Sequence, residues 1–249
     1  MLMTIYKTSE VASIIGVHPN TVRLYEEWGL ISKPERLENG YRIFTDLHIR
    51  QMQLARIAFQ IELLQNGLRK KIVETVKTVA TGDYIGAIRL TNEYINMIDK
   101  ECFNAEDAIK IVQNILHGEE TINSVSMKRK EVSEYLGISM DALRNWEMNG
   151  LLTVKRKENG YRIYTDDDIK RLKIIRSLRC ANYSFEAILH MLRQLSQNPN
   201  TDIRYALNIP KQTDDIISAC DRLILSLSKA KKNAKTILDM LYEMNKEIV

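Results

Sequence analysis

The chain contains the same pattern of residues twice, at a constant separation. The two copies share apolar, glycine, arginine and glutamate positions in the same order. These positions are Val11, Gly16, Arg23, Glu26, Gly29 and Leu30 in the first copy and Val132, Gly137, Arg144, Glu147, Gly150 and Leu151 in the second. After a shift of one residue, the segment Glu-Asn-Gly-Tyr-Arg-Ile at 38–43 recurs at 158–163. An internal repeat of this kind indicates that one structural module is built twice, so the chain holds two copies of one function.

Each copy begins with two short helical segments that are separated by a turn containing glycine. In the first copy the apolar pattern ends at Gly16, and His18 and Pro19 then begin a second segment that ends at Gly29. In the second copy Ser139 takes the capping position. This arrangement predicts a helix-turn-helix, whose second helix, here called the reading helix, enters the major groove of DNA.

A β-wing is expected to follow each helix pair. The Asn-Gly pairs at 39–40 and 159–160 are strong hairpin signals because both residue types tolerate positive φ, and β-favouring residues come next. Thr45 and Thr165 then begin a third helix, with Asp168 completing a capping box in the second copy. The expected fold is mainly α, with two winged helix-turn-helix domains joined by helices and a long C-terminal helix of coiled-coil type.

Together these motifs resemble the MerR family of bacterial transcription regulators. The resemblance rests on the glycine turn, Arg-x-aromatic-Glu in the reading helix, Gly-Leu after it, and Asn-Gly-Tyr-Arg in the wing, in this order and twice. It covers residues 6–60 and 127–195. The segment 183–188 resembles the family's fourth helix, whereas 63–68 aligns poorly in the first copy. The resemblance implies double-stranded promoter or operator DNA as the partner, with RNA polymerase as a further candidate.

Candidate DNA-binding residues lie in the reading helices and the wings. Arg23 and Arg144 are placed where a guanidinium can bind guanine or a phosphate; the alternative is a surface arginine paired with Glu26, Glu27 or Glu147. The family resemblance implies backbone contacts from the wing arginines. The full predicted set is His18, Asn20, Thr21, Arg23, Tyr25, Tyr41, Arg42, Ser139, Asp141, Arg144, Asn145, Trp146, Tyr161 and Arg162.

The aromatic members of this set have structural alternatives. Tyr25 and Trp146 lie in the reading helices and are equally well explained as core residues packed against the wing. Tyr41 and Tyr161 are expected to pack in the wing and to leave a hydroxyl group for a phosphate. Family members carry two consecutive aromatic residues in the reading helix, where this chain has Leu24-Tyr25 and Asn145-Trp146.

The two copies differ at the start of the reading helix. Asn20-Thr21 in the first copy becomes Asp141-Ala142 in the second. Asparagine can pair with adenine, whereas aspartate can only accept from cytosine or repel a phosphate. If both helices read DNA, the two half-sites differ and the operator is not a palindrome.

Two further helical regions join and follow the modules. An apolar stripe predicts a helix over about 84–101, after which Asn104 can cap another helix as far as Leu116. A much longer helix begins near Thr213, and its apolar positions step by three and four residues in a heptad seam. The predicted domains are the first module (1–75), connecting helices (76–117), a polar linker (118–126), the second module (127–197) and the C-terminal region (198–249).

In the MerR family, the helix after each module pairs with its twin across a homodimer. Here both modules and both helices lie in one chain, so the economical inference is an intrachain pseudo-dimer. The alternative is a homodimer through the C-terminal helix, with four reading helices. The predicted 84–101 helix is too short to cover the C-terminal seam unless residues 104–116 or a second chain cover the rest.

Composition excludes several other classes of protein. No apolar run is long enough to span a membrane, and the N-terminus lacks a secretory signal, so the cytoplasm is the expected compartment. Three distant cysteines and four scattered histidines give no metal-ligand spacing, and no cofactor is expected. No catalytic motif indicates an enzyme. The alternatives to a transcription regulator are an architectural or recombination-accessory DNA-bending protein, or a protein-interaction module that no longer binds DNA; the net charge of +4 permits DNA binding without arguing for it.

Overall fold

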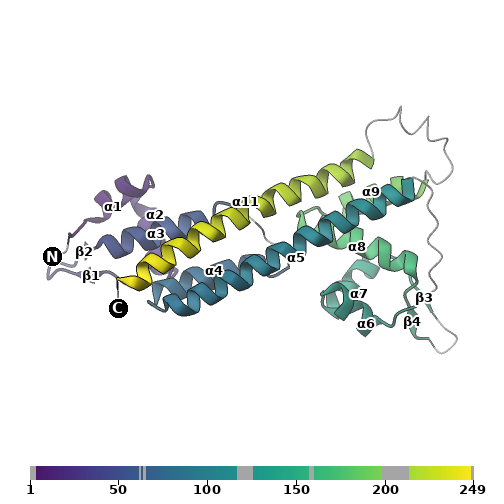
Figure 1. Cartoon of the computed structure of the whole chain (residues 1–249), viewed down its shortest axis with the longest axis horizontal. Helices are drawn as coiled ribbons and strands as arrows, with labels where there is room; N and C mark the ends of the chain where they lie inside the picture. The colour runs from purple at the N-terminus through teal and green to yellow at the C-terminus, as the bar shows by residue number, and fades with distance from the viewer. Residues whose placement is uncertain are drawn as a thin grey trace. The chain divides into compact units, whose positions relative to one another are not determined.

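The helices and turns expected from the repeat are present in both copies. A computed structural model describes residues 4–61, 63, 66–116, 126–156, 160–197 and 213–247. These residues form two compact units. Unit 1 contains the described residues up to 61, 67–98 and 228–247, and unit 2 contains 63, 66 and those between 99 and 227 (Figure 1). The predicted linker at 118–126, apart from Ser126, lies outside the described residues.

The first winged helix-turn-helix lies in unit 1. Its elements are α1 (Thr8–Ile15), α2 (Pro19–Glu27), β1 (Glu35–Arg36), β2 (Arg42–Ile43) and α3 (Asp46–Ala58). Helix α1 ends at Gly16, whose φ of 70° is the left-handed conformation that glycine adopts most easily. His18 caps the reading helix α2 as predicted, because its Nδ1 accepts from the backbone N–H of Asn20 at 3.2 Å.

The second winged helix-turn-helix lies in unit 2 and repeats this geometry. Its elements are α6 (Arg129–Leu136), α7 (Met140–Met148), β3 (Lys155–Arg156), β4 (Arg162–Ile163) and α8 (Asp166–Cys180). Ser139 caps the reading helix α7, since its Oγ accepts from Ala142 N–H at 3.0 Å. The expected capping box is also present: Thr165 N–H donates to the Asp168 carboxylate at 2.8 Å, and Asp168 N–H donates to the Thr165 hydroxyl at 3.3 Å.

Both wings are two-stranded antiparallel hairpins with equivalent registers. In the first, Arg36 pairs with Arg42, and in the second Arg156 pairs with Arg162. Gly40 and Gly160 have φ values of 81° and 79°, as the Asn-Gly signal predicts, although Asn159 itself lies outside the described residues. The chain before each α1-type helix adds a bridge to the wing, Tyr6 to Phe44 and Met127 to Tyr164.

A fourth helix follows the third in each unit. In unit 2 it is α9 (Phe185–Gln197), which begins after Ser184 as expected. In unit 1 it is α4 (Leu68–Ala80), which begins after Gly67 in the left-handed conformation. The first copy thus keeps a fourth helix despite its poor match to the family pattern.

The connecting region is one helix, α5 (Tyr84–Leu116), with 33 residues. The predicted break at Asn104 is therefore wrong. An asparagine can cap a helix, but that local preference is weak, and burial of Ala105, Ala108 and Val112 continues the apolar stripe through this point. As a result α5 is almost as long as the C-terminal helix α11 (Thr213–Lys246), which has 34 residues.

The apolar seam predicted for α11 is buried within the single chain. Each seam position has at most 4 % of its surface exposed. These positions are Cys220, Leu223, Leu227, Ala230, Ala234, Ile237, Leu241 and Met244. Residues 84–98 of α5 and 228–246 of α11 belong to unit 1, and residues 99–116 of α5 and 213–227 of α11 belong to unit 2. The two long helices therefore pass through the units in opposite chain order.

In unit 1 the third helix of the first module is bound by α11, the helix that follows the second module. Asn233 Nδ2 donates to the carbonyl of Ile57 at 3.2 Å and to Gln60 Oε1 at 3.0 Å. Near the other end of α3, Arg50 Nη1 donates to Glu247 Oε1 at 2.6 Å. Figure 1 shows the yellow end of α11 beside α3.

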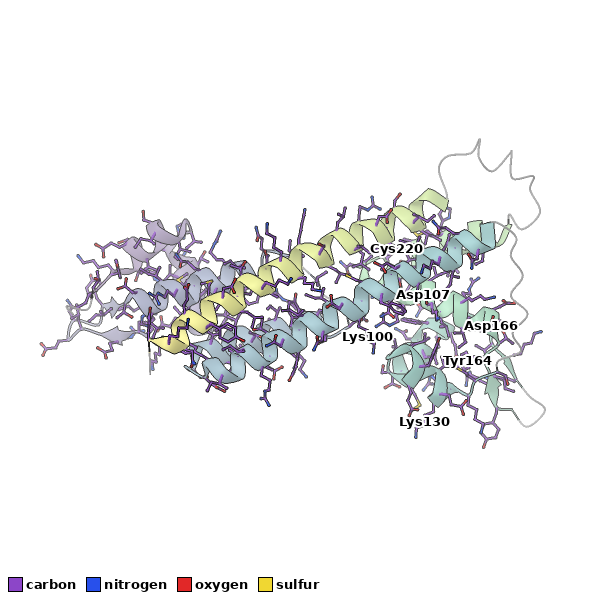
Figure 2. All side chains as sticks on the ribbon, viewed as in Figure 1. Lys100, Asp107, Lys130, Tyr164, Asp166 and Cys220 are labelled. Atoms are coloured by element: carbon purple, nitrogen blue, oxygen red, sulfur yellow. The ribbon has the colours of Figure 1, made fainter. Side chains whose placement is uncertain are left out.

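In unit 2 the third helix of the second module is bound by α5, the helix that follows the first module. Arg176 forms a two-pronged ion pair with Glu101, with N–O distances of 2.6 and 2.7 Å, and both residues are about 95 % buried. Arg176 Nε also donates to the Leu136 carbonyl at 2.8 Å, and Asn66 Nδ2 donates to Glu101 at 3.1 Å. Lys173 adds a pair with Asp107, labelled in Figure 2, at 3.0 Å.

We predict that Arg176→Met lowers the free energy of unfolding by about 3–5 kcal/mol, because Glu101 is left charged and buried without its partner. Urea denaturation followed by circular dichroism measures the effect. Adding Glu101→Leu should recover most of the loss. The repeat supplies a matched control: the exposed Arg56 occupies the equivalent position in the first module, and Arg56→Met should change stability by less than about 0.5 kcal/mol. Equal losses at both positions would contradict the prediction.

Candidate nucleic-acid interface

The reading helix of the first module presents a linked pair of polar side chains. Arg23 and Asn20 are exposed on α2, and Arg23 Nη1 donates to Asn20 Oδ1 at 2.9 Å. Thr21 beside them is half-buried, and His18 is exposed at the cap. A guanidinium and an amide held together in this way can each form two hydrogen bonds to a base edge.

The reading helix of the second module presents different chemistry. Arg144, Asp141 and Asn145 are exposed on α7. Asn145 accepts from Asn149 Nδ2 through its side-chain oxygen at 2.8 Å. Arg144 forms no hydrogen bond or ion pair with any residue that the structure describes, so its guanidinium is available to a ligand. Asp141 places a negative charge in the first turn, where it stabilises the helix dipole and disfavours an approaching phosphate.

In each module a glutamate of the reading helix forms an ion pair with an arginine of the wing. In the first module Arg42 of β2 pairs with Glu26 of α2, and Arg36 of β1 lies 3.4 Å from the same carboxylate. In the second module Arg162 Nε lies 2.7 Å from Glu147 Oε2. The two glutamate side chains are only 9 % and 10 % exposed. The glutamates therefore bind the wing arginines rather than Arg23 or Arg144, and they set the position of each wing relative to its reading helix.

The second module adds a further contact to this carboxylate. The hydroxyl group of Tyr164 donates to Glu147, whereas the first module has Phe44 at the equivalent position and cannot form this bond. Burial, followed by the hydrogen bond and charge of Glu147, raises the pKa of Tyr164 well above its usual range. Tyr164 is thus a neutral hydrogen-bond donor that helps to fix the second wing.

The aromatic candidates separate into two groups. Trp146 is 6 % exposed and belongs to the hydrophobic core of unit 2. It is therefore a core residue and not a residue that contacts DNA directly. Tyr25 is half-buried against the core of the first module. Tyr41 and Tyr161 are 68 % and 73 % exposed at the wing tips. The expectation that they pack in the wing is therefore wrong, because a two-stranded hairpin offers no second face to cover them.

Polar residues on the third helices, one buried and one half-buried, hold the segment that follows each reading helix. Gln51 accepts from Ser32 N–H at 2.7 Å and donates to the Val79 carbonyl at 3.2 Å. At the equivalent position Arg171 Nε donates to the Leu151 carbonyl at 2.7 Å. The two modules therefore use different side chains to bind the backbone that follows the reading helix.

Two of the three cysteines are buried. Cys180 and Cys220 are buried, and burial raises the pKa of both thiols to about 12, so each stays protonated at neutral pH. Within the described ranges, no group of three His, Cys, Asp or Glu side chains could hold a metal ion. No described helix is long and apolar enough to cross a membrane.

Both modules match models of one family. Residues 7–44 match the model described as MerR family regulatory protein, and residues 127–195 match the model described as MerR HTH family regulatory protein. The two modules belong to the MerR family. The matched segments contain both MerR-type reading helices and the wing arginines Arg42 and Arg162.

Several curated transcriptional regulators are similar to part of the chain. The HTH-type transcriptional regulator CueR of Escherichia coli O6:H1 is 45 % identical over 53 residues, which cover 21 % of this chain and 39 % of CueR. The HTH-type transcriptional regulator AdhR of Bacillus subtilis is 33 % identical over 76 residues, covering 30 % of this chain and 54 % of AdhR. The similarity thus extends over about two fifths to one half of these relatives.

One solved structure is also similar. It is the crystal structure of HiNmlR, a MerR family regulator lacking the sensor domain, bound to promoter DNA. The sequences are 26 % identical, the match covers 38 % of this chain and 71 % of that chain, and the TM-score is 0.29.

The DNA-binding residues predicted from the sequence do not include several cations that flank the MerR-type reading helices. Lys128, Arg129 and Lys130 lie at the start of α6, and Arg36 and Arg156 lie on the first strand of each wing. A run of three basic residues directly before a predicted helix was a sequence signal for the first group. For the wing strands, the facing registers of Arg36 with Arg42 and of Arg156 with Arg162 identify the individual arginines.

We predict that Glu147→Gln lowers the free energy of unfolding by about 1–3 kcal/mol, because Arg162 and Tyr164 lose a charged acceptor. Thermal or urea unfolding measures the loss. The control is Glu134→Gln: its side chain is 67 % exposed in a loose surface pair with Lys130, so the expected change is below about 0.5 kcal/mol. A result for Glu147→Gln within the range of this control would refute the linking role of the carboxylate.

Proposed function

We propose that this protein is a sequence-specific DNA-binding transcription regulator. The observation that carries the proposal is the equivalent exposure of Arg23 and Arg144 on two MerR-type reading helices, each beside a wing that a Glu–Arg pair holds in place. An exposed guanidinium in the middle of such a helix can bind guanine O6 and N7 or clamp a phosphate. The exposed Tyr41 and Tyr161 at the wing tips can add hydrogen bonds to the DNA backbone.

The two modules should read different half-sites. The first offers the Asn20–Arg23 pair, and the second offers Arg144 with Asp141. Asparagine favours adenine, and aspartate accepts from cytosine at most. Because one chain carries both readers in a fixed ratio, its preferred operator is asymmetric, which is a site that two identical readers do not favour.

We further infer that one chain acts as a pseudo-dimer. Each third helix is bound by the long helix that follows the other module: α3 by Asn233 and Glu247, and α8 by Glu101 and Asp107. The seam of α11 is already buried within the chain, which leaves no such seam for a second copy. Both observations favour intrachain pairing over a homodimer with four reading helices.

Regulation in this proposal includes distortion of the promoter. Two readers on one chain meet both half-sites at a spacing that the protein sets, so the DNA between them bends or twists to fit. Such deformation costs roughly 1–6 kcal/mol by elastic estimates, which contacts from the two wings to phosphates can offset. RNA polymerase is the partner that would then use the realigned promoter.

Arginine substitutions on the reading helices test DNA recognition. We predict that Arg23→Ala and Arg144→Ala each weaken binding to a selected operator by about 1–3 kcal/mol at fixed salt, with relaxed preference at one base pair if the contact is to guanine. Fluorescence anisotropy with single-base operator variants measures both effects. Arg89→Ala, at an exposed position on α5, is the control and should leave the affinity unchanged. A change of only a few tenths of a kcal/mol in both variants would refute the site assignment.

Analytical ultracentrifugation tests the pseudo-dimer. We predict a species of one chain, 28.9 kDa, over the micromolar range, and a complex of one chain with one operator duplex. Footprinting should show unequal protection of the two half-sites. A species of two chains without DNA, or a perfect inverted repeat protected equally by both modules, would contradict the proposal.

A further inference from the structure

A cluster of cations surrounds a cavity on the second module. We call it the basic pocket and define it by Lys128, Arg129 and Lys130 at the start of α6 and Arg162 on β4. The cavity has a volume of about 780 Å³ and opens between the helix-turn-helix and the wing. Tyr161, 73 % exposed, forms part of its wall. In Figure 2, Lys130 lies on the α6–α7 side of the module and points away from the core.

Arg162 is paired with Glu147 at 2.7 Å, so the charge that the basic pocket leaves available comes from Lys128, Arg129 and Lys130. Arg129 Nη2 donates to the Met140 carbonyl at 2.8 Å, which orients the guanidinium, and its Nε is buried without a partner among the described residues. The Lys130 side chain is 79 % exposed and pairs loosely with Glu134 at 3.8 Å, an interaction that water screens. The carboxylate of Glu131 accepts from Lys128 N–H at 2.7 Å as part of the helix cap.

The first module lacks this concentration of charge. Thr8 and Ser9 occupy the positions of Arg129 and Lys130, while the lysine, the capping glutamate and the wing arginine are the same in both copies. The second module therefore carries two more positive charges at the same place between helix and wing. Guanidinium and ammonium groups beside a tyrosine hydroxyl fit the phosphates of a nucleic-acid backbone, which carry no sequence information.

The reading helices differ in the opposite sense. The first module presents the Asn20–Arg23 pair, which suits base edges, whereas the second places Asp141 in the first turn of its reading helix. A carboxylate at that place narrows the bases that can be accepted and repels phosphates. The second module thus has more cations for the DNA backbone, and its reading helix has groups that are less suited to base edges.

We propose that the two modules divide the work of binding: the second anchors the protein to DNA phosphates through the basic pocket, and the first supplies most of the base discrimination. This inference rests on the proposed function, since it assigns different roles to two modules that both bind DNA. The anchor is sequence-independent and sensitive to salt, because each phosphate contact releases condensed counterions. Binding of bases by the first module depends on the sequence and is less sensitive to salt.

The test measures affinity as a function of salt concentration. The probes are a duplex selected by the unaltered protein from a random pool and a scrambled duplex of equal length. Arg129→Thr with Lys130→Ser introduces the residues of the first module, and we expect the slope of log K against log [salt] to fall in magnitude by about 1.8, from about 0.9 per contact, on both duplexes. Lys130→Ser alone, at a side chain that is 79 % exposed, should lower it by about 0.9. Asn20→Ala should change base preference and leave the slope unchanged.

Each outcome distinguishes the two proposals. If the unaltered protein selects no duplex from the pool and does not bind the scrambled duplex at low salt, the proposed function is wrong. This inference is then wrong as well. If the unaltered protein binds but Lys130→Ser and the double variant keep its salt slope, only the division of work is wrong. The division of work is also wrong if the double variant loses base preference, or if Asn20→Ala keeps the base preference of the unaltered protein. The reciprocal change, Thr8→Arg with Ser9→Lys, should steepen the slope, and circular dichroism checks that each variant is folded.

Discussion

Two helices of 33 and 34 residues carry long apolar stripes that must each be covered, and this requirement organises the molecule. Parts of α5 and α11 belong to both units, and the seam of α11 is buried within this chain. In unit 2, Ala108 and Val112 of α5 belong to the same hydrophobic cluster as Ile216 and Cys220 of α11. Each module's third helix then rests on the long helix that follows the other module. The folding of each unit therefore depends on segments that are far apart in the sequence.

The polar contacts on this frame differ between the units. The first module uses Asn233 and the exposed pair of Arg50 with Glu247, whereas the second uses the buried pair of Arg176 with Glu101. A buried ion pair contributes little net stability relative to apolar residues, but losing one partner is costly, so it favours one arrangement of the helices over others. At the site, Glu26 and Glu147 act in a similar way on the wings. These contacts thus hold the helices and wings that carry the proposed DNA-binding groups in place without DNA.

The local parts of this structure could be predicted from the sequence, and so could the helices and wings that carry the candidate site. Glycine turns, caps and the hairpin signal depend on neighbouring residues, and these predictions are confirmed. The errors concern positions where tertiary burial decides. Asn104 does not end a helix, because the stripe on both sides of it is buried. Tyr41 and Tyr161 are exposed, since the two-stranded wing has nothing to cover them. Glu101 interrupts an apolar stripe, which was a signal that a buried partner exists but did not identify Arg176.

The sequence by itself determined that one MerR-type module occurs twice, where each reading helix and wing lies, and that the copies differ at the start of the reading helix. These properties follow from local backbone preferences and from the repeat. Only the tertiary structure decided which long helix supports which module, that Trp146 is a core residue, and that the wing arginines are bound to Glu26 and Glu147. The physical reason is that apolar stripes and charged side chains have many equivalent partners along a chain, and packing in three dimensions selects among them.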